Sequence, residues 1–264
     1  MGKLSDALEK RQQENKIVAT RLDTDRESTD PEPDLKIIED IHPKLVVHSS
    51  PESIEAEKFK ELRAQVLFPK DGKKKKIILA TSIFPGEGKT FVAVNLAASI
   101  AMSMNEHVLL VDCDFRRPAL HKMFSYPNRA GLHDFLENRM ELSELIIRTK
   151  IEKLSFLPAG RPTKKPAELL SSAEMSAFLN EVKERYDDRY IILDSAPMYI
   201  TSEVNVLTKY VDGVIFVILN GRTPRETVKK HLQKIGKENL IGVVFNGYDQ
   251  NFKQYNKFYR NQYK

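Results

Sequence analysis

Lys89 and Thr90 are residues whose type and spacing indicate phosphate chemistry. They end the segment PGEGKT, which comes shortly after the apolar run KIILATS. A strand that leads into such a glycine turn presents several backbone N–H groups to one phosphate. The lysine then reaches the β- and γ-phosphates, and the hydroxyl binds Mg²⁺. The strict form of this loop has a glycine at position 83, where this chain has Ile83. We predict nucleotide binding by Pro85, Gly86, Glu87, Gly88, Lys89, Thr90 and Phe91.

Two further segments place carboxylates at the ends of apolar runs. The segment VLLVDCDFRRP has Asp112, Asp114 and Arg116 at alternate positions, which in an extended chain point to one side. The segment YIILDSAP ends its apolar run at Asp194, and parallel sheets bind ligands at the carboxyl ends of their strands. Two carboxylates would repel a polyphosphate unless Mg²⁺ lies between them or one accepts a proton. The pattern therefore indicates catalysis on a magnesium polyphosphate, and we add Arg116 to the predicted nucleotide-binding residues.

An alternation of strands and helices must position these segments, and it begins near Lys76. The apolar runs HVLLVDCD, LSFLPAG, YIILDSAP, GVIFVIL and IGVVFN are continuous, as is typical of strands buried on both faces. Helical patterns lie at about 88–104, 165–186 and 224–237. A serine cap with Pro51 in the first turn predicts another helix of about four or five turns ahead of the first strand. We predict an α/β fold of the P-loop NTPase type, with a mostly parallel sheet flanked by helices.

The composition limits the class of protein. The chain has 264 residues, of which 41% are hydrophobic and 30% charged, as in ordinary globular proteins. Its single cysteine, Cys113, excludes a disulfide within the chain, and its six histidines lack zinc-ligand spacing. A net charge of +5 is too small to indicate nucleic-acid binding, and no apolar run approaches the roughly 20 residues that cross a bilayer. We expect a cytoplasmic protein that binds no nucleic acid.

Three parts of the chain are predicted. Residues 1–48 form an N-terminal arm, mostly flexible, because TRLDTDRESTDPEPD offers little to bury. Residues 49–247 form the phosphate-loop domain, and residues 248–264 form a mobile tail without aliphatic side chains. Four of the nine tyrosines lie in this tail, and we expect them to be exposed: Tyr248, Tyr255, Tyr259 and Tyr263.

The segments PGEGKT, LLVDCDFRRP and IILDSAP, in this order and spacing, resemble the Walker A, Walker A′ and Walker B motifs of bacterial tyrosine autokinases (BY-kinases) that regulate capsule and exopolysaccharide synthesis. These kinases belong to the same broad ATPase class as the MinD and ParA partitioning proteins. That class has a second lysine in Walker A where this chain has Phe84, which favours the kinase branch. The segment AGRPTKKPAELLSS is also similar to one in these kinases, and the resemblance covers roughly residues 50–250.

The resemblance implies in-line transfer of the γ-phosphoryl group of ATP to a tyrosine hydroxyl. Lys89 and the loop amides would hold the phosphate charge, while Thr90, Asp114 and Asp194 manage Mg²⁺. Asp112 is the predicted base, because a phenol with a pKa of about 10 is protonated at neutral pH. The predicted catalytic residues are thus Lys89, Asp112, Asp114 and Asp194.

The tail has two interpretations. In the kinases that the chain resembles, such a tyrosine cluster is the autophosphorylation target and enters the active site of a neighbouring subunit. Phe252, Tyr255, Tyr259 and Tyr263 also recur at nearly helical spacing among basic residues, as in a helix that docks on anionic lipid in MinD-like ATPases. The substrate interpretation is favoured, since the face carries hydroxyls and no aliphatic side chain.

Assembly is predicted from the segment EKFKELR, which approximates the Glu-x2-Arg-x2-Arg helix that the resembling kinases use to build a ring. Glu57 and Arg63 match, and Lys60 replaces the first arginine. Lysine cannot form a bidentate fork, so a ring would be weaker or different. An ordinary amphipathic helix with i,i+3 pairs explains the segment equally well.

The resemblance further implies a membrane adaptor that activates the kinase and recruits it to the inner face of the plasma membrane. Two other functions remain open at this point. One is a positioning ATPase that hydrolyses ATP without making phosphotyrosine, and the other is a catalytically silent nucleotide-binding regulator.

Overall fold

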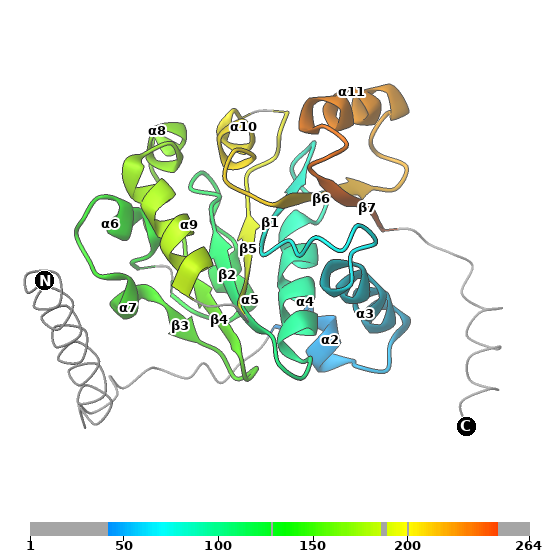
Figure 1. The fold of residues 1–264 in the computed structure, drawn as a ribbon, viewed down its shortest axis with the longest axis horizontal. Helices are drawn as coiled ribbons and strands as arrows, with labels where there is room; N and C mark the ends of the chain where they lie inside the picture. Colours follow the sequence, from blue (N-terminus) through cyan, green and yellow to red (C-terminus); the bar gives the residue numbers. More distant parts are fainter. Residues whose placement is uncertain (1–41, 128, 186–188, 200, 248–264) are drawn as a thin grey trace, which may run out of the picture. The chain divides into compact units, whose positions relative to one another are not determined.

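The computed structural model of this protein describes residues 42–127, 129–185, 189–199 and 201–247. A seven-stranded sheet with the order β3-β4-β2-β5-β1-β6-β7 lies at its centre (Figure 1). All neighbouring strands are parallel except the antiparallel pair β3 and β4. The strands are β1 (Ile77–Ser82), β2 (His107–Asp112), β3 (Ile147–Arg148), β4 (Leu154–Leu157), β5 (Arg189–Asp194), β6 (Gly213–Leu219) and β7 (Leu240–Asn246). The mostly parallel α/β sheet predicted from the sequence is therefore confirmed.

Helices cover both faces of the sheet (Figure 1). One layer comprises α2 (Val46–Ser49), α3 (Ile54–Leu67), α4 (Lys89–Ala101) and α5 (Leu120–Met123). The other comprises α6 (Leu132–Leu136), α7 (Leu142–Leu145), α8 (Pro166–Leu170), α9 (Ala173–Arg185), α10 (Glu203–Leu207) and α11 (Arg225–Ile235). Within the described residues, none of these helices is both long and apolar enough to cross a membrane.

The continuous apolar strands follow from this three-layer arrangement. Successive strand side chains point to opposite faces, so both alternating sets must be apolar when helices cover both faces. In β1, Ile78 and Ala80 pack under α4, whereas Ile77 and Leu79 pack in the opposite layer. All residues of α4 from Val92 to Ala101 are buried, because α4 lies between the sheet and α3.

Two predicted helices have different bounds in the structure. The helix predicted over 165–186 is two helices, because the Ser172 hydroxyl accepts a hydrogen bond from the Met175 N–H at 3.1 Å and starts α9 anew. The helix predicted to include Pro51 begins instead at Ile54. Its cap is Ser53, whose hydroxyl accepts from the Ala56 N–H at 3.1 Å. Helices α4 and α11 lie inside their predicted ranges.

The predicted domain start at residue 49 falls inside a packed segment. Leu45 and Val47 are buried in the layer formed with α3 and α4. The Asn95 side chain of α4 ties this segment down: its Nδ2 donates to the Lys44 carbonyl at 2.9 Å, and its Oδ1 accepts from the Val47 N–H at 3.3 Å. The structured domain therefore includes residues 42–48, which the sequence assigned to the arm. The rest of the predicted arm and the whole tail lie outside the described residues.

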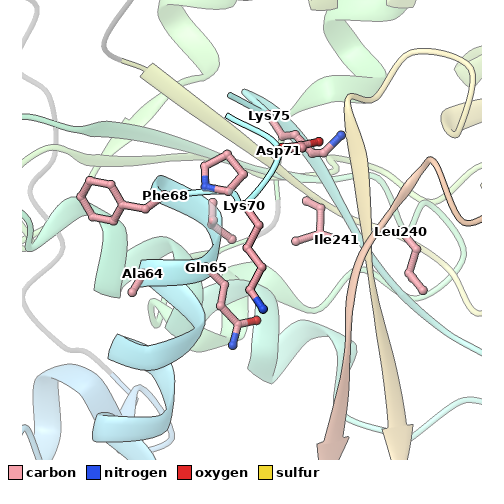
Figure 2. Close-up of a pocket in the computed structure, with 10 residues that line it drawn as sticks. Ala64, Gln65, Phe68, Lys70, Asp71, Lys75, Leu240 and Ile241 are labelled. Atoms are coloured by element: carbon pink, nitrogen blue, oxygen red, sulfur yellow. The ribbon is translucent and has the colours of Figure 1, made fainter. Parts of the chain in front are cut away.

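An open pocket of about 610 Å³ lies near the amino ends of the strands. The end of α3, the segment after it and the start of β7 line it (Figure 2). Phe68, which is 78% exposed, points away from Leu240 and Ile241 on the other wall (Figure 2). None of the predicted nucleotide-binding or catalytic residues lines this pocket.

Candidate active site

The phosphate loop is the turn between β1 and α4, at the carboxyl end of a central strand. Gly86 and Gly88 have φ values of 82° and 96°, a region that glycine enters without steric cost. A Cβ atom on Gly88 would also collide with the side chain of Asn246. Helix α4 starts at Lys89, so the unpaired N–H groups of its first turn lie at this edge of the sheet, where an anion binds favourably.

Four predicted residues come together beside this loop. The Lys89 ammonium lies 3.0 Å from Asp114 Oδ2 and 3.8 Å from Asp194 Oδ1. The Thr90 hydroxyl donates to Asp194 Oδ2 at 2.6 Å. These contacts arise because β2, β5 and β1 are neighbours in the sheet, with Asp112 directly opposite Asp194 in the strand register. The three sequence segments therefore meet at one place.

The charges at this place are unbalanced. Three carboxylates face one ammonium group, and the Asp112 and Asp194 side chains are completely buried. Burial raises the pKa of Asp194 despite the opposing effects of Lys89 and Thr90. Burial works against the charged form of Lys89, but Asp194 and Asp114 together raise its pKa. The site thus keeps its lysine charged and has an excess of negative charge, which favours a cation.

Asp194 supplies the observation that fits a metal. Its Oδ1 atom is buried and accepts no hydrogen bond from any described residue. In the described part of the chain, no cluster of three or more His, Cys, Asp or Glu residues could hold a metal by itself. Mg²⁺ usually takes one or two carboxylates together with waters and substrate phosphates. Thr90, Asp114 and Asp194 therefore fit a magnesium ion that arrives with a nucleotide.

Asp112 occupies a different environment from Asp194. Its Oδ1 accepts from the Asp114 N–H at 3.1 Å, and its Oδ2 accepts from the N–H groups of Ala119 and Leu120 at 3.0 and 3.1 Å. Burial, followed by the charge of Asp194, raises the pKa of Asp112 to about 7. A group with that pKa can accept a proton near neutral pH. The contact with Lys89 is made by Asp114 and not by Asp112. The assignment of Asp112 as the base stays a prediction.

Arg116 does not continue the alternation that the sequence predicted. Strand β2 ends at Asp112, and the amides that bind Asp112 turn the chain away from an extended path. Arg116 Nε instead donates to Glu203 Oε1 at 2.8 Å. The Glu203 side chain is 1% exposed, whereas that of Arg116 is half exposed. Sequence reasoning missed Glu203, which lies 87 positions from its partner.

The Glu87 side chain braces the loop and does not face a ligand site. It is fully buried, and Oε2 accepts from the Phe84 N–H at 2.7 Å. Oε1 accepts from the hydroxyl of Thr223, in the loop after β6. Asn246 Nδ2 donates to the Glu87 carbonyl at 2.9 Å. The predicted role of Glu87 in nucleotide binding is thus limited to its backbone, and the bracing partners Thr223 and Asn246 carried no sequence signal.

The remaining predicted loop residues differ in their surroundings. Pro85 and Gly86 are exposed at the turn. The Phe91 ring points to α3 and meets Phe59 edge to face, with centroids 5.6 Å apart. The Phe91 side chain therefore belongs to the core layer under α3, so its predicted contact with a nucleotide is also limited to the backbone.

The residues predicted to assemble a ring lie on α3. Lys60 Nζ contacts Glu57 Oε2 at 2.9 Å, and both side chains are more than 40% exposed. Arg63 instead donates from Nη1 to the Ser99 carbonyl at 2.8 Å, which fastens α3 to α4. Arg63 has a role inside the domain, and Glu57 and Lys60 form the i,i+3 pair of an ordinary helix.

The four tail tyrosines, Tyr248, Tyr255, Tyr259 and Tyr263, lie outside the described residues. The strand before them, β7, ends at Asn246, which bonds to the phosphate loop. The last described residues of the chain therefore lie beside the candidate active site.

Comparisons with known proteins agree with this geometry. Residues 75–238, more than half of the chain, match the family model described as an AAA domain. The tyrosine-protein kinase CpsD of Streptococcus pneumoniae is 34% identical over 188 residues, which cover 70% of this chain and 81% of that protein. The crystal structure of the chimerical protein CapA2B2 superposes with a TM-score of 0.73 at 30% identity, covering 82% of this chain and 96% of that one.

A more distant neighbour supports the fold alone. The septum site-determining protein MinD of Pyrococcus horikoshii, in complex with Mg-ADP, is 24% identical, with a TM-score of 0.53 over 66% of this chain and 70% of that one. The resemblance to the kinases inferred from three motifs is therefore confirmed by whole-domain comparison, and MinD shares the fold. This chain belongs to the family of bacterial tyrosine-protein kinases that are built on an AAA domain.

Proposed function

We propose that this protein is an ATP- and Mg²⁺-dependent tyrosine autokinase that phosphorylates its own C-terminal tyrosines in trans. The observation that carries the proposal is the convergence of Lys89, Thr90, Asp114 and Asp194. The buried Asp194 Oδ1 accepts no hydrogen bond from the part of the chain that the structure describes. A lysine, a hydroxyl and an unsatisfied carboxylate at a phosphate loop are the groups that a magnesium nucleotide requires.

Each residue has a role in the transfer. The tyrosine oxygen forms a bond to the γ-phosphorus as the bond from that phosphorus to the β–γ bridging oxygen breaks, which releases ADP. Lys89 and the loop amides would hold the phosphate oxygens. Thr90, Asp114 and Asp194 would hold Mg²⁺, which would neutralise charge on those oxygens. The phenol proton passes to Asp112, whose raised pKa suits a group that accepts a proton near neutral pH.

The biological role proposed here is control of capsule or exopolysaccharide synthesis or export. The resemblance of the three motifs to kinases of those pathways supports it, as does the similarity to CpsD. We further propose that a membrane adaptor of the polysaccharide-copolymerase type activates the protein at the inner face of the plasma membrane. Homo-oligomers would bring the tail of one copy to the site of another.

Phosphate mapping tests the proposal. The full chain is incubated with ATP and Mg²⁺ beside Lys89→Met and a chain that ends at Gly247, and phosphate is located by mass spectrometry. Lys237→Met, which removes an exposed lysine near the amino end of β7, is the matched control. We expect phosphotyrosine in the tail of the wild-type protein and the control, and none in the other two.

A second function, positioning by an ATPase cycle, draws support from the MinD-like fold. It predicts a different product from the same experiment. Free phosphate released without any phosphotyrosine would favour the positioning ATPase, and an absence of turnover would favour a silent nucleotide-binding regulator.

A further inference from the structure

Two aromatic side chains form a pair at the edge of the candidate active site. Phe84 lies in the turn after β1, and Tyr199 lies in the segment after β5. Their ring centroids are 4.8 Å apart, with the ring planes inclined by 48°. Phe84 is half-buried against the core layer of α8 to α11, whereas Tyr199 is 62% exposed. One ring is thus anchored and supports a second ring that faces solvent.

The backbone fixes both rings to the catalytic loops. The N–H groups of Met198 and Tyr199 donate to the carbonyls of Ser82 and Ile83, at 2.8 and 3.0 Å. The Phe84 N–H donates to Glu87 Oε2 inside the phosphate loop. Phe84 precedes Lys89 by five residues, and Tyr199 follows Asp194 by five residues. The aromatic pair therefore has a set position relative to the two loops that hold the phosphate and the metal.

An exposed aromatic ring in a fixed position suits the binding of another ring. Aromatic rings attract one another when offset or tilted, at centroid distances of about 4.5–7 Å. The exposed face of Tyr199 leaves room for a third ring in such an arrangement. The tail offers four tyrosines and two phenylalanines among 17 residues, without an aliphatic side chain. The described residues end at Gly247, next to Asn246, which bonds to the phosphate loop.

We propose that Phe84 and Tyr199 form a subsite that binds the phenol ring of an incoming tyrosine, supplied by the tail of a second copy. This inference rests on the proposed kinase function, and it explains why the enzyme would prefer tyrosine as its substrate. Serine and threonine have no ring to pack against Tyr199, so the subsite binds them less well. The Tyr199 ring acts here through its face, and its hydroxyl takes no part.

A peptide of residues 248–264 tests the subsite with the full-length protein as enzyme. The variants are Phe84→Ala and Tyr199→Ala, which remove a ring, and Tyr199→Phe, which keeps the ring. Phe68→Ala is the matched control, since it removes an exposed ring at the distant pocket (Figure 2). We expect KM for the peptide to rise about three- to ten-fold in both ring-removing variants, with kcat and ATP affinity unchanged. Tyr199→Phe and Phe68→Ala should match the wild type.

Binding of the same peptide, labelled and measured by fluorescence anisotropy with a non-hydrolysable ATP analogue, gives a readout without turnover. The affinity should fall by the same factor in Phe84→Ala and Tyr199→Ala. An unchanged KM and affinity in Tyr199→Ala would overturn the subsite, as would an equal loss of ATP affinity or an equal effect of Tyr199→Phe. A wild-type protein that forms no phosphotyrosine but binds the peptide through Tyr199 would overturn the kinase function and leave the subsite standing.

Discussion

The ends of β2 and β5 carry two aspartates that match in type, burial and strand position but differ in their partners. Asp112 and Asp194 stand opposite each other in the register, and both are completely buried. Three backbone N–H groups bind the Asp112 carboxylate. Among the described residues Asp194 accepts a side-chain hydrogen bond only from Thr90, and its Oδ1 has no hydrogen bond and lies 3.8 Å from the Lys89 ammonium. Burial and strand position do not separate the two carboxylates, whereas bonding capacity does: Asp194 has an oxygen left to bind a metal, and the backbone already occupies both oxygens of Asp112.

The largest expected difference between the two aspartates is in kinase activity, and Asp194→Asn tests it. The amide keeps an acceptor for Thr90 but removes the charge that would face the metal, so we expect tyrosine phosphorylation to fall by about 10²–10³-fold. Titration with Mg²⁺ and ADP should show a parallel loss of affinity. Thermal unfolding of the ligand-free protein should change less than in the corresponding Asp112 variant. A stable, fully active Asp194→Asn protein would remove the basis of the comparison.

The complementary change, Asp112→Asn, should lower stability in addition to removing the proposed base. An asparagine can present only one acceptor oxygen, so at least one of the three N–H groups loses its partner, which costs about 1–3 kcal/mol in the free energy of unfolding. Urea unfolding of the ligand-free protein measures this. Asp114→Asn serves as the control, because Asp114 accepts a single backbone hydrogen bond, from Arg117. Equal stability of the two variants would contradict the structural role of Asp112.

The pH dependence of stability gives a smaller and independent test. Burial raises the pKa of Asp112 from the ordinary value of 3.8 to about 7, so the folded state holds a proton that the unfolded state has released in this range. The free energy of unfolding therefore contains a contribution that is complete below about pH 4 and is lost as the pH rises through about 7. In Asp112→Asn this contribution is absent, and the fall in Tm between pH 5 and 7.5 should be shallower.

The Asp194 pKa is also raised by burial, and this part persists in the Asp112→Asn variant. The mutual repulsion of the two carboxylates is lost in the variant, and its loss has the same sign as the loss of the Asp112 contribution. The lowered pKa of Asp212, whose carboxylate pairs with Lys183, has the opposite sign and cancels in the difference. Parallel Tm curves for the wild type and the variant would show that Asp112 is ionised throughout.

The sequence was sufficient to predict the sheet and the meeting of the three motifs. Continuous apolar runs require strands covered on both faces, and parallel strands bring their carboxyl ends to one edge. Lys89, Thr90, Asp114 and Asp194 therefore converge once the order β2-β5-β1 is formed. The motif spacing contains that information because each side chain sits at or next to the end of an element.

The partners that organise these residues were not predictable in the same way. Glu203, Thr223 and Asn246 are common residue types without a motif, and they reach Arg116 and Glu87 only through the packing of distant elements. The break between α8 and α9 also escaped, because serine is tolerated inside a helix and becomes a cap only when the chain turns. Backbone amides that bind Asp112 leave no trace in residue type at all.

A substitution of Glu203 should have the smallest effect on stability and activity. It tests whether a buried oxygen without a hydrogen bond is by itself enough to bind a metal. Like Asp194, Glu203 is buried and has one carboxylate oxygen without a hydrogen bond among the described residues. Its other oxygen pairs with an arginine at 2.8 Å, so this pair carries no net charge, whereas at Asp194 three carboxylates share the single Lys89 ammonium. We expect Glu203→Gln to change the free energy of unfolding by less than about 1 kcal/mol, since the amide oxygen still accepts from Arg116 and the half-exposed arginine remains hydrated. Mg²⁺ dependence of phosphorylation should be the same as in the wild type. Asp194→Asn should raise the Mg²⁺ concentration that phosphorylation requires. If Glu203→Gln raised it as well, a buried oxygen without a hydrogen bond would be enough to bind the metal, and the excess of negative charge at Asp194 would not contribute.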